Sequence, residues 1–171
     1  WIVVGAGTGG TSATIGRYVR YQRHDSRLCV ADPAGSVFAA YHRSGDANLA
    51  GAGSRIEGIG RPRVEASFIR TVIDRMVEVA DADSIAAMQA LSQLLGRRVG
   101  PSTGTNLVGM LTLAHEMLAH GEQGSILSLL CDSGERYLPT YYNAQWVAEK
   151  MGDCTAALAA ITKLMRPAPA A

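Results

Sequence analysis

The N-terminal part of the chain alternates apolar runs with a glycine cluster and a helix-compatible segment. Residues 1–4 are apolar, residues 5–10 hold four glycines, and residues 11–23 are compatible with a helix. A short apolar run that ends in glycines predicts a buried strand followed by a turn. Residues 28–32 predict a second buried strand, and the spacing fits a parallel pair connected through the helix.

The middle of the chain predicts an irregular region followed by a strand and a helix. Residues 33–64 are rich in glycine and arginine and lack sustained periodicity, so we expect a loop region there. Residues 76–80 are the third strand candidate. Asp83 is expected to cap the next helix, which ends before Gly96. Its apolar positions recur at steps of three and four residues: Ile85, Met88, Leu91 and Leu95.

The last third of the chain continues the alternation. A helix from Thr103 is expected to end at Gly121, and residues 125–131 predict a fourth strand. Strands that alternate with helices predict an α/β layered fold with a largely parallel sheet. The apolar stripe of the helix consists of Leu107, Met110, Leu111, Ala114, Met117 and Leu118. Two closing helices and a possible strand end are predicted at residues 146–151, 155–165 and 97–101.

Composition and charge narrow the classes of partner. The chain has 171 residues and a formal net charge of +1, with no basic stripe, so neither nucleic acid nor an anionic membrane surface is an expected partner. No apolar run approaches the ~20 residues of a membrane span. The three cysteines, Cys29, Cys131 and Cys154, form no C-x-x-C pair, and we expect all three to be buried free thiols.

The chain opens in what looks like the middle of an apolar strand, which we interpret as the mark of a fragment. On this interpretation residues 1–165 are the C-terminal part of a larger catalytic domain, whose N-terminal part is absent. Residues 166–171, rich in proline and alanine, are expected to be a disordered tail.

The glycine cluster is the strongest candidate for a binding site. It follows a strand and opens a helix, where backbone N–H groups and the helix dipole favour an anion. The alternative is a tight turn without a ligand. Gly5, Gly7 and Gly10 also match G-x-G-x-x-G, and Asp32 lies where a dinucleotide fold places its ribose-binding acid. A turn-starting carboxylate is the simpler interpretation of Asp32.

Three further groups of residues are candidates for ligand or metal binding. Residues 100–106 form a second glycine and hydroxyl cluster at a helix start, where Ser102 or Thr103 alternatively serves as a cap. Residues 55–60 form a third glycine turn. His115 and His120 are five residues apart, about 140° around a helix, so we reject a metal site there. The other two histidines are expected at the surface: His24 and His42.

Four motifs, in order, resemble those of the pyridoxal-phosphate enzymes of the cysteine synthase and cystathionine β-synthase family. They are Gly-Thr-Gly-Gly-Thr at 7–11, Glu-Gly-Ile-Gly at 57–60, Ser-Thr-Gly at 102–104 and Asp-Ser-Gly-Glu-Arg-Tyr at 132–137. The resemblance covers about residues 1–147. Within the family, residues 56–65 and 100–106 are most similar to actinobacterial L-cysteine desulfhydrases.

This resemblance implies a fold, a cofactor and a set of site residues. The fold is that of the large domain of fold type II enzymes, the tryptophan synthase β-like class, and the cofactor is pyridoxal 5'-phosphate. Ser102 is implied to contact the pyridine nitrogen, and Gly58 to lie on the substrate side. The loop implied to hold the cofactor phosphate consists of Gly7, Thr8, Gly9, Gly10 and Thr11.

The implied reaction needs a lysine that this chain does not offer in a family motif. Its two lysines, Lys150 and Lys163, follow the last motif, so we expect no catalytic residue among the 171 and place the family lysine upstream. The implied activity is α,β-elimination of L-cysteine, in a cytoplasmic homodimer that takes an amino-acid substrate. The alternatives are β-replacement by a cysteine synthase or cystathionine β-synthase, a nicotinamide-dinucleotide-binding module, and a non-catalytic protein that keeps the fold.

Overall fold

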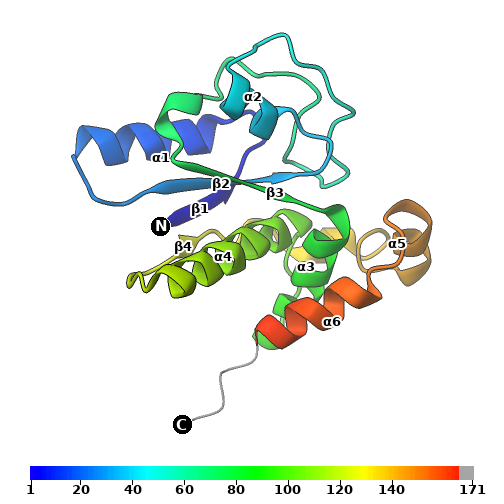
Figure 1. The fold of residues 1–171 in the computed structure, drawn as a ribbon. Helices are drawn as coiled ribbons and strands as arrows, with labels where there is room; N and C mark the ends of the chain where they lie inside the picture. The colour runs from blue at the N-terminus through cyan, green and yellow to red at the C-terminus, as the bar shows by residue number, and fades with distance from the viewer. Residues whose placement is uncertain (166–171) are drawn as a thin grey trace.

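The centre of the protein is a parallel β-sheet of four strands (Figure 1). The computed structural model describes residues 1–165, and the predicted tail at 166–171 lies outside these residues. The strand order is β3-β2-β1-β4, and every pairing is parallel. The predicted α/β fold with a largely parallel sheet is therefore confirmed. The strands are β1 (Ile2–Gly5), β2 (Leu28–Pro33), β3 (Arg75–Val79) and β4 (Leu127–Ser128).

Helices cover both faces of the sheet. On one face α1 (Gly10–Tyr21) lies on β1 and β2, and α2 (Phe38–Ser44) lies on β3 beside the short turn η1 (Arg70–Val72). On the other face α4 (Pro101–His120) packs against all four strands (Figure 1). Next to α4 lies α3 (Asp81–Leu95), which also packs against α6 (Thr155–Leu164). The remaining elements are η2 (Gly134–Tyr137) and α5 (Ala144–Lys150).

The strands alternate their side chains between the two helical layers. Val3 and Cys29 belong to the core beneath α4, while the neighbouring residues Val4 and Val30 belong to the core beneath α1 and α2. Successive strand residues point to opposite faces of the sheet, and here helices cover both faces. This is why β1 and the first four residues of β2 are continuous apolar runs, whereas β3 carries the exposed residues Arg75 and Glu78.

The main elements lie where the sequence predicts them, with one addition. The predicted loop region at 33–64 contains the helix α2, so that prediction is incomplete. A seven-residue helix is too short to show periodicity, and its stability comes from tertiary contacts. The ring of Phe38 stacks on Phe68 with centroids 4.1 Å apart, and Asp32 Oδ2 accepts a hydrogen bond from Ala39 N at 2.8 Å.

Two predicted boundaries are wrong. The helix expected to be capped by Asp83 begins at Asp81, after Ala80, and no side chain caps it. The two aspartates instead lie in the first turn, where they favour the positive end of the helix dipole. The predicted fourth strand is only two residues long, because residues 129–131 turn toward α4: Leu129 O accepts from Asn106 Nδ2 at 3.4 Å.

Burial of several side chains also differs from the prediction. Cys29 is buried, but Cys131 is exposed and Cys154 is half-buried, although all three are free thiols as predicted. His24 is exposed, whereas His42 is half-buried, with Nε2 3.1 Å from Ile73 O. Leu118, placed in the predicted apolar stripe of α4, is 80 % exposed. The buried side of α4 is formed mainly by its first six residues together with Gly109 and Leu113.

The first turns of α4 are buried because glycine lets two helices touch. A Cβ atom at Gly104 would lie 2.0 Å from Ser84 O and 2.8 Å from Met88 N, both in α3. Such a close backbone approach leaves no space for a methyl group. The contact fixes the N-terminus of α4, which lies at the carboxyl end of the sheet.

We therefore predict that Gly104→Ala destabilises the full-length protein by roughly 2 kcal/mol, as expected for overpacking, although the same change in an exposed helix stabilises by about 1 kcal/mol. Gly109→Ala is the matched control, since its Cβ would meet side-chain atoms at 3.0 and 3.1 Å and a backbone atom only at 4.0 Å, so the loss of stability should be smaller. Denaturant unfolding measures both. An unchanged or raised unfolding midpoint for Gly104→Ala would contradict the packing argument.

Candidate functional site

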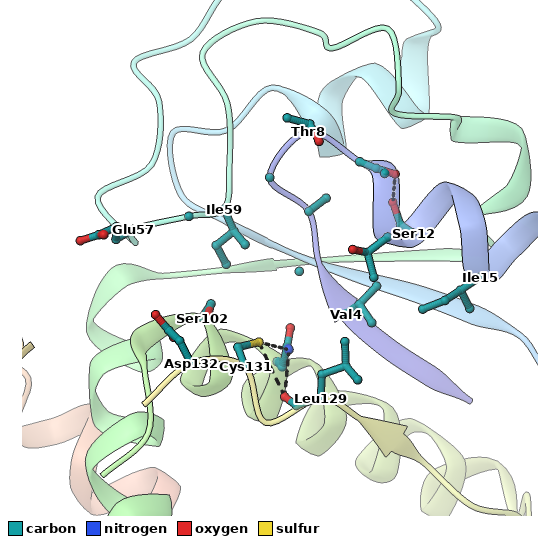
Figure 2. Close-up of a pocket in the computed structure, with 18 of the residues that line it drawn as sticks. Val4, Thr8, Ser12, Ile15, Glu57, Ile59, Ser102, Leu129, Cys131 and Asp132 are labelled. Atoms are coloured by element: carbon teal, nitrogen blue, oxygen red, sulfur yellow. Dashed lines mark hydrogen bonds between the residues drawn. The ribbon is translucent and has the colours of Figure 1, made fainter. Parts of the chain in front are cut away.

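A cavity of about 810 Å³ opens at the carboxyl end of β1. Figure 2 shows Thr8 and Ser12 on one side of it, with Ser102, Cys131 and Asp132 on the opposite side. Residues 57–59 form a third wall. In sheets with helices on both faces, ligands bind outside the carboxyl ends of the strands. The structure thus brings the four sequence motifs at 7–11, 57–60, 102–104 and 132–137 around one cavity.

The loop between β1 and α1 is held in place by hydrogen bonds to its carbonyl groups. Ala6 O accepts a hydrogen bond from Gly60 N at 2.8 Å, Gly7 O accepts from Arg61 Nε at 3.2 Å, and Thr8 O accepts from Ser67 Oγ at 2.7 Å. Three consecutive carbonyls are therefore occupied by residues 60–67. None of these contacts uses an N–H group of the loop.

Those N–H groups form a set of unused donors. Among residues 1–165, no acceptor partners the backbone N–H groups from Gly7 to Ser12 or the hydroxyls of Thr8 and Thr11. They gather at the N-terminus of α1, where the helix dipole adds positive potential. The arrangement is suited to an anion with several acceptor oxygens, such as a phosphate monoester.

Glycine is required in this loop for two reasons. A Cβ at Gly7 would lie 2.4 Å from Gly58 O, and a Cβ at Gly9 would lie 2.5 Å from Phe68 Cα. Gly9 also has a φ of 89°, which side chains disfavour. The glycines thus allow the loop to pack against residues 58–68 while it lines the cavity.

The three hydroxyl residues at the start of α4 have different surroundings. Thr103 Oγ1 accepts from Cys131 N at 3.0 Å, and Thr105 Oγ1 donates to Ser84 Oγ at 2.8 Å, so both are structural. Ser102 lines the cavity and is 8 % exposed. Gly100 is the N-cap and no side chain caps the helix, so the alternative of a cap at Ser102 or Thr103 is wrong.

The wall that carries Gly58 is positioned by the C-terminal part of the chain. Tyr141 Oη accepts from Glu57 N at 3.1 Å and donates to Arg55 O at 2.8 Å. Burial is the main reason why the pKa of Tyr141 is raised. Arg136 adds an ion pair to Glu57 at 3.1 Å. Gly58 itself has a φ of 88° and open space around its Cα, so its backbone conformation explains the glycine.

Two polar residues of the cavity belong to clusters found in the sequence, but the sequence analysis gave neither of them a role of its own. Asn106 is 1 % exposed, and its Oδ1 has no hydrogen-bond partner among residues 1–165. It lies four residues after Ser102, hence on the same face of α4, which is the signal that would have found it. Asp132 accepts from Tyr137 Oη at 2.5 Å, and burial together with this carboxylate raises the pKa of Tyr137.

Asp32 does not face the cavity. Its carboxylate is 1 % exposed and receives the N–H of Ala39, so it anchors the start of α2 and is closed to a ribose. Asp32 lies within β2 and its carboxylate binds α2, so the nicotinamide alternative loses its acidic residue. Burial raises the pKa of Asp32 to about 6, although hydrogen bonds from Ser36 and Ala39 oppose the shift.

Neither lysine belongs to the site. Lys150 ends α5, where its carbonyl accepts from Arg55, and Lys163 is exposed near the end of α6. Neither lines the cavity. Within residues 1–165 no cluster of three His, Cys, Asp or Glu side chains is placed to bind a metal ion. In the same residues no helix has the length and apolar composition to cross a membrane.

The family model for pyridoxal-phosphate dependent enzymes matches residues 1–132, and the chain belongs to this family. It is 56 % identical to L-cysteine desulfhydrase Cds1 of Mycobacterium tuberculosis, over 97 % of this chain and 45 % of that protein. It is 31 % identical to cysteine synthase 2 of Schizosaccharomyces pombe, over 86 % of this chain and 40 % of that protein. It is 29 % identical to cystathionine beta-synthase of Apis mellifera, over 86 % of this chain and 28 % of that protein. The chain thus spans less than half the length of these relatives.

The cavity fits the cofactor of the family. Its donor-rich loop offers six N–H groups without protein acceptors to a dianionic phosphate. A volume of about 810 Å³ is ample for a small ring compound. A buried hydroxyl at Ser102 and an unpartnered amide oxygen at Asn106 are polar groups that a ligand can satisfy.

The buried carboxyl of Asp32 predicts a pH dependence of stability. Its pKa of about 6 in the folded state exceeds the ordinary 3.8, so the folded state binds the proton more tightly. Ionisation therefore costs stability as pH rises from about 4 to about 6, by up to about 3 kcal/mol. Unfolding of the full-length protein should show wild type losing stability relative to Asp32→Asn over this range. The exposed Asp25→Asn is the control, and a constant difference for Asp32→Asn would refute the prediction.

Proposed function

We propose that the protein to which this chain belongs eliminates the β-substituent of L-cysteine, converting cysteine and water to hydrogen sulfide, ammonia and pyruvate. The observation that carries the proposal is the 56 % identity to a protein named L-cysteine desulfhydrase, over 97 % of the chain. This identity is far above the 29–31 % to cysteine synthase 2 and cystathionine beta-synthase.

We assign the phosphate of pyridoxal phosphate to the loop of Gly7, Thr8, Gly9, Gly10 and Thr11. The support is the set of N–H groups and hydroxyls that have no partner among the described residues. When bound, the cofactor supplies an electron sink for negative charge at the α-carbon of an amino acid. Gly58 lies on the third wall of the cavity, where its backbone borders the loop at Gly7, and is assigned to the substrate side.

Ser102 is assigned to the pyridine nitrogen of the cofactor. Its side chain lies at the N-terminus of α4, is nearly buried, and makes no hydrogen bond to residues 1–165. A neutral hydroxyl does not hold a proton on that nitrogen as a carboxylate does. The electron sink is then moderate, which suits rapid loss of a β-substituent.

The lysine on which the family's chemistry depends is expected in the part of the protein outside this chain. Lys150 and Lys163 are remote from the cavity. We therefore expect residues 1–165 to supply cofactor-binding residues and one wall of the substrate site, with no catalytic residue. The whole protein is expected to be a cytoplasmic homodimer.

A second candidate is β-replacement, in which a second nucleophile rather than water completes the reaction. The relatives named cysteine synthase 2 and cystathionine beta-synthase support it. Both reactions need the same phosphate loop and pyridine contact. They differ in which nucleophile gains access to the site.

Substituting Ser102 tests its assignment. Ser102→Asp should retain the cofactor but lose at least tenfold in kcat, because a carboxylate would keep the pyridine nitrogen protonated and overstabilise negative charge. Ser102→Thr keeps a hydroxyl and is the matched control. Cofactor affinity and turnover of the full-length enzyme are measured separately. Wild-type turnover of Ser102→Asp would mean that Ser102 does not contact the ring.

The reaction itself is tested by comparing three assays on the full-length enzyme. Sulfide release from L-cysteine is measured beside cysteine formation from O-acetylserine and sulfide, and beside cystathionine formation from serine and homocysteine. We expect elimination to have the highest kcat/KM. If either synthesis exceeds it by tenfold, about 1.4 kcal/mol in barrier, the desulfhydrase assignment is wrong while the cofactor assignment stands.

A further inference from the structure

One of the groups that hold the loop after β1 carries a positive charge. The carbonyls of residues 6 and 8 accept from neutral donors, a backbone amide and the hydroxyl of Ser67. Gly7 O instead accepts from the guanidinium of Arg61, whose Nε lies 3.2 Å away. Hydrogen bonds from charged donors are roughly twice as strong as those from neutral ones. The loop is therefore held at Gly7 by a cation, although neutral donors suffice at both neighbouring carbonyls.

The guanidinium of Arg61 has no carboxylate partner of its own. It forms no ion pair within residues 1–165, and the side chain is half-buried. The two acids on the same segment have other partners: Glu57 pairs with Arg136 at 3.1 Å. Glu65 pairs with Arg63 at 3.5 Å. A cation that is partly withdrawn from water without a counter-ion raises the local positive potential, and this favours an anion nearby.

The backbone of Arg61 is held in place as well as its side chain. Its N–H donates to Ser36 Oγ at 3.3 Å, and its carbonyl accepts from Val37 N at 3.0 Å. Both partners belong to the turn before α2. The next residue toward the N-terminus, Gly60, donates its N–H to the carbonyl of residue 6. The guanidinium therefore starts from a fixed backbone on both sides of the contact with the loop.

The peptide unit between residues 7 and 8 connects this charge to the cavity. Gly7 O and Thr8 N belong to this unit, and its trans geometry directs C=O and N–H to opposite sides. A hydrogen bond from a cation to the carbonyl polarises the unit and makes its N–H a stronger donor. Thr8 N has no acceptor among residues 1–165, and Thr8 lines the cavity whereas Arg61 does not. The charge thus acts on the cavity through the loop.

We propose that Arg61 is a positioning residue that acts through the Gly7 carbonyl and makes the loop selective for a phosphate with two negative charges. This inference rests on the assignment of the cofactor phosphate to the loop under the proposed function. Neutral donors serve a phosphate with one or two charges, whereas attraction to a cation grows in proportion to the charge of the anion. Arg61 therefore determines how strongly the site prefers the dianion.

The test compares two ligands on full-length protein freed of cofactor: pyridoxal phosphate and its monomethyl phosphate ester, which carries one negative charge. We expect Arg61→Gln to weaken binding of pyridoxal phosphate at least tenfold and binding of the ester at most threefold. Arg61→Lys retains the charge and should keep the wild-type ratio of the two affinities within twofold. If Arg61→Gln weakens both ligands equally, the side chain only braces the loop and the inference is wrong.

Two neighbouring residues provide matched controls. Ser67→Ala removes a neutral brace, the hydroxyl that donates to Thr8 O at 2.7 Å, and should weaken both ligands by the same factor. Arg63→Gln removes the same charge from a side chain that is 78 % exposed and pairs with Glu65, so both affinities should stay within twofold of wild type. A loss of dianion preference in Arg63→Gln as large as in Arg61→Gln would assign the effect to net charge and overturn the inference. Unfolding midpoints identify any variant that fails to fold, and Arg61→Lys then carries the comparison.

These measurements separate the inference from the proposed function, because binding requires no turnover. A wild-type protein that releases sulfide from cysteine, with an Arg61→Gln variant that keeps the full preference for the dianion, would lose this inference and keep the proposed function. A wild-type protein that shows the expected binding pattern but releases no sulfide would keep the inference and lose the proposed reaction. Failure of the wild type to bind pyridoxal phosphate would overturn both.

Discussion

The site depends on how the loop after β1 divides its hydrogen bonds. Residues 60–67 occupy three successive carbonyls of this loop, and no acceptor among the described residues reaches the N–H groups from Gly7 to Ser12. The result is a concentration of donors at a helix N-terminus that costs free energy until an anion satisfies it. Close packing of Gly7 on Gly58 makes the arrangement rigid. An anion therefore meets donors that are already oriented.

The opposite wall is held by packing rather than by charge. Gly104 lets α4 touch α3, and this contact places Ser102 and Asn106 at the carboxyl edge of the sheet. The hydroxyl of Thr103 accepts a hydrogen bond from Cys131 N, and the hydroxyl of Thr105 donates one to Ser84 Oγ. The first turn of α4 therefore separates structural hydroxyls from one that is free for a ligand, within a span of four residues.

Local sequence signals predicted the sheet and the glycine loop between β1 and α1 well, because buried parallel strands are apolar runs and a strand–glycine–helix junction is a local pattern. The local signals failed where contacts between residues distant in sequence determine the structure. The helix α2 depends on the stacking of Phe38 on Phe68 and on Asp32, and β4 is short because Asn106 and Thr103 bind residues 129–131. The prediction that Cys131 is buried also failed. Its exposure follows from the turn of residues 129–131 toward α4. The only local sequence signal that Asn106 lines the cavity is its spacing of four residues from Ser102 on a helix.

The contacts of Tyr141 also bear on the order in which the site is assembled. Its hydroxyl joins Arg55 and Glu57, residues 86 and 84 positions earlier in the chain. Contacts between residues so distant in sequence form late in folding, since the intervening loop must first be ordered. During synthesis the glycine loop after β1 emerges well before the residues around Tyr141 that hold the wall at Gly58. The cavity acquires its final shape only when the segment around Tyr141 has left the ribosome.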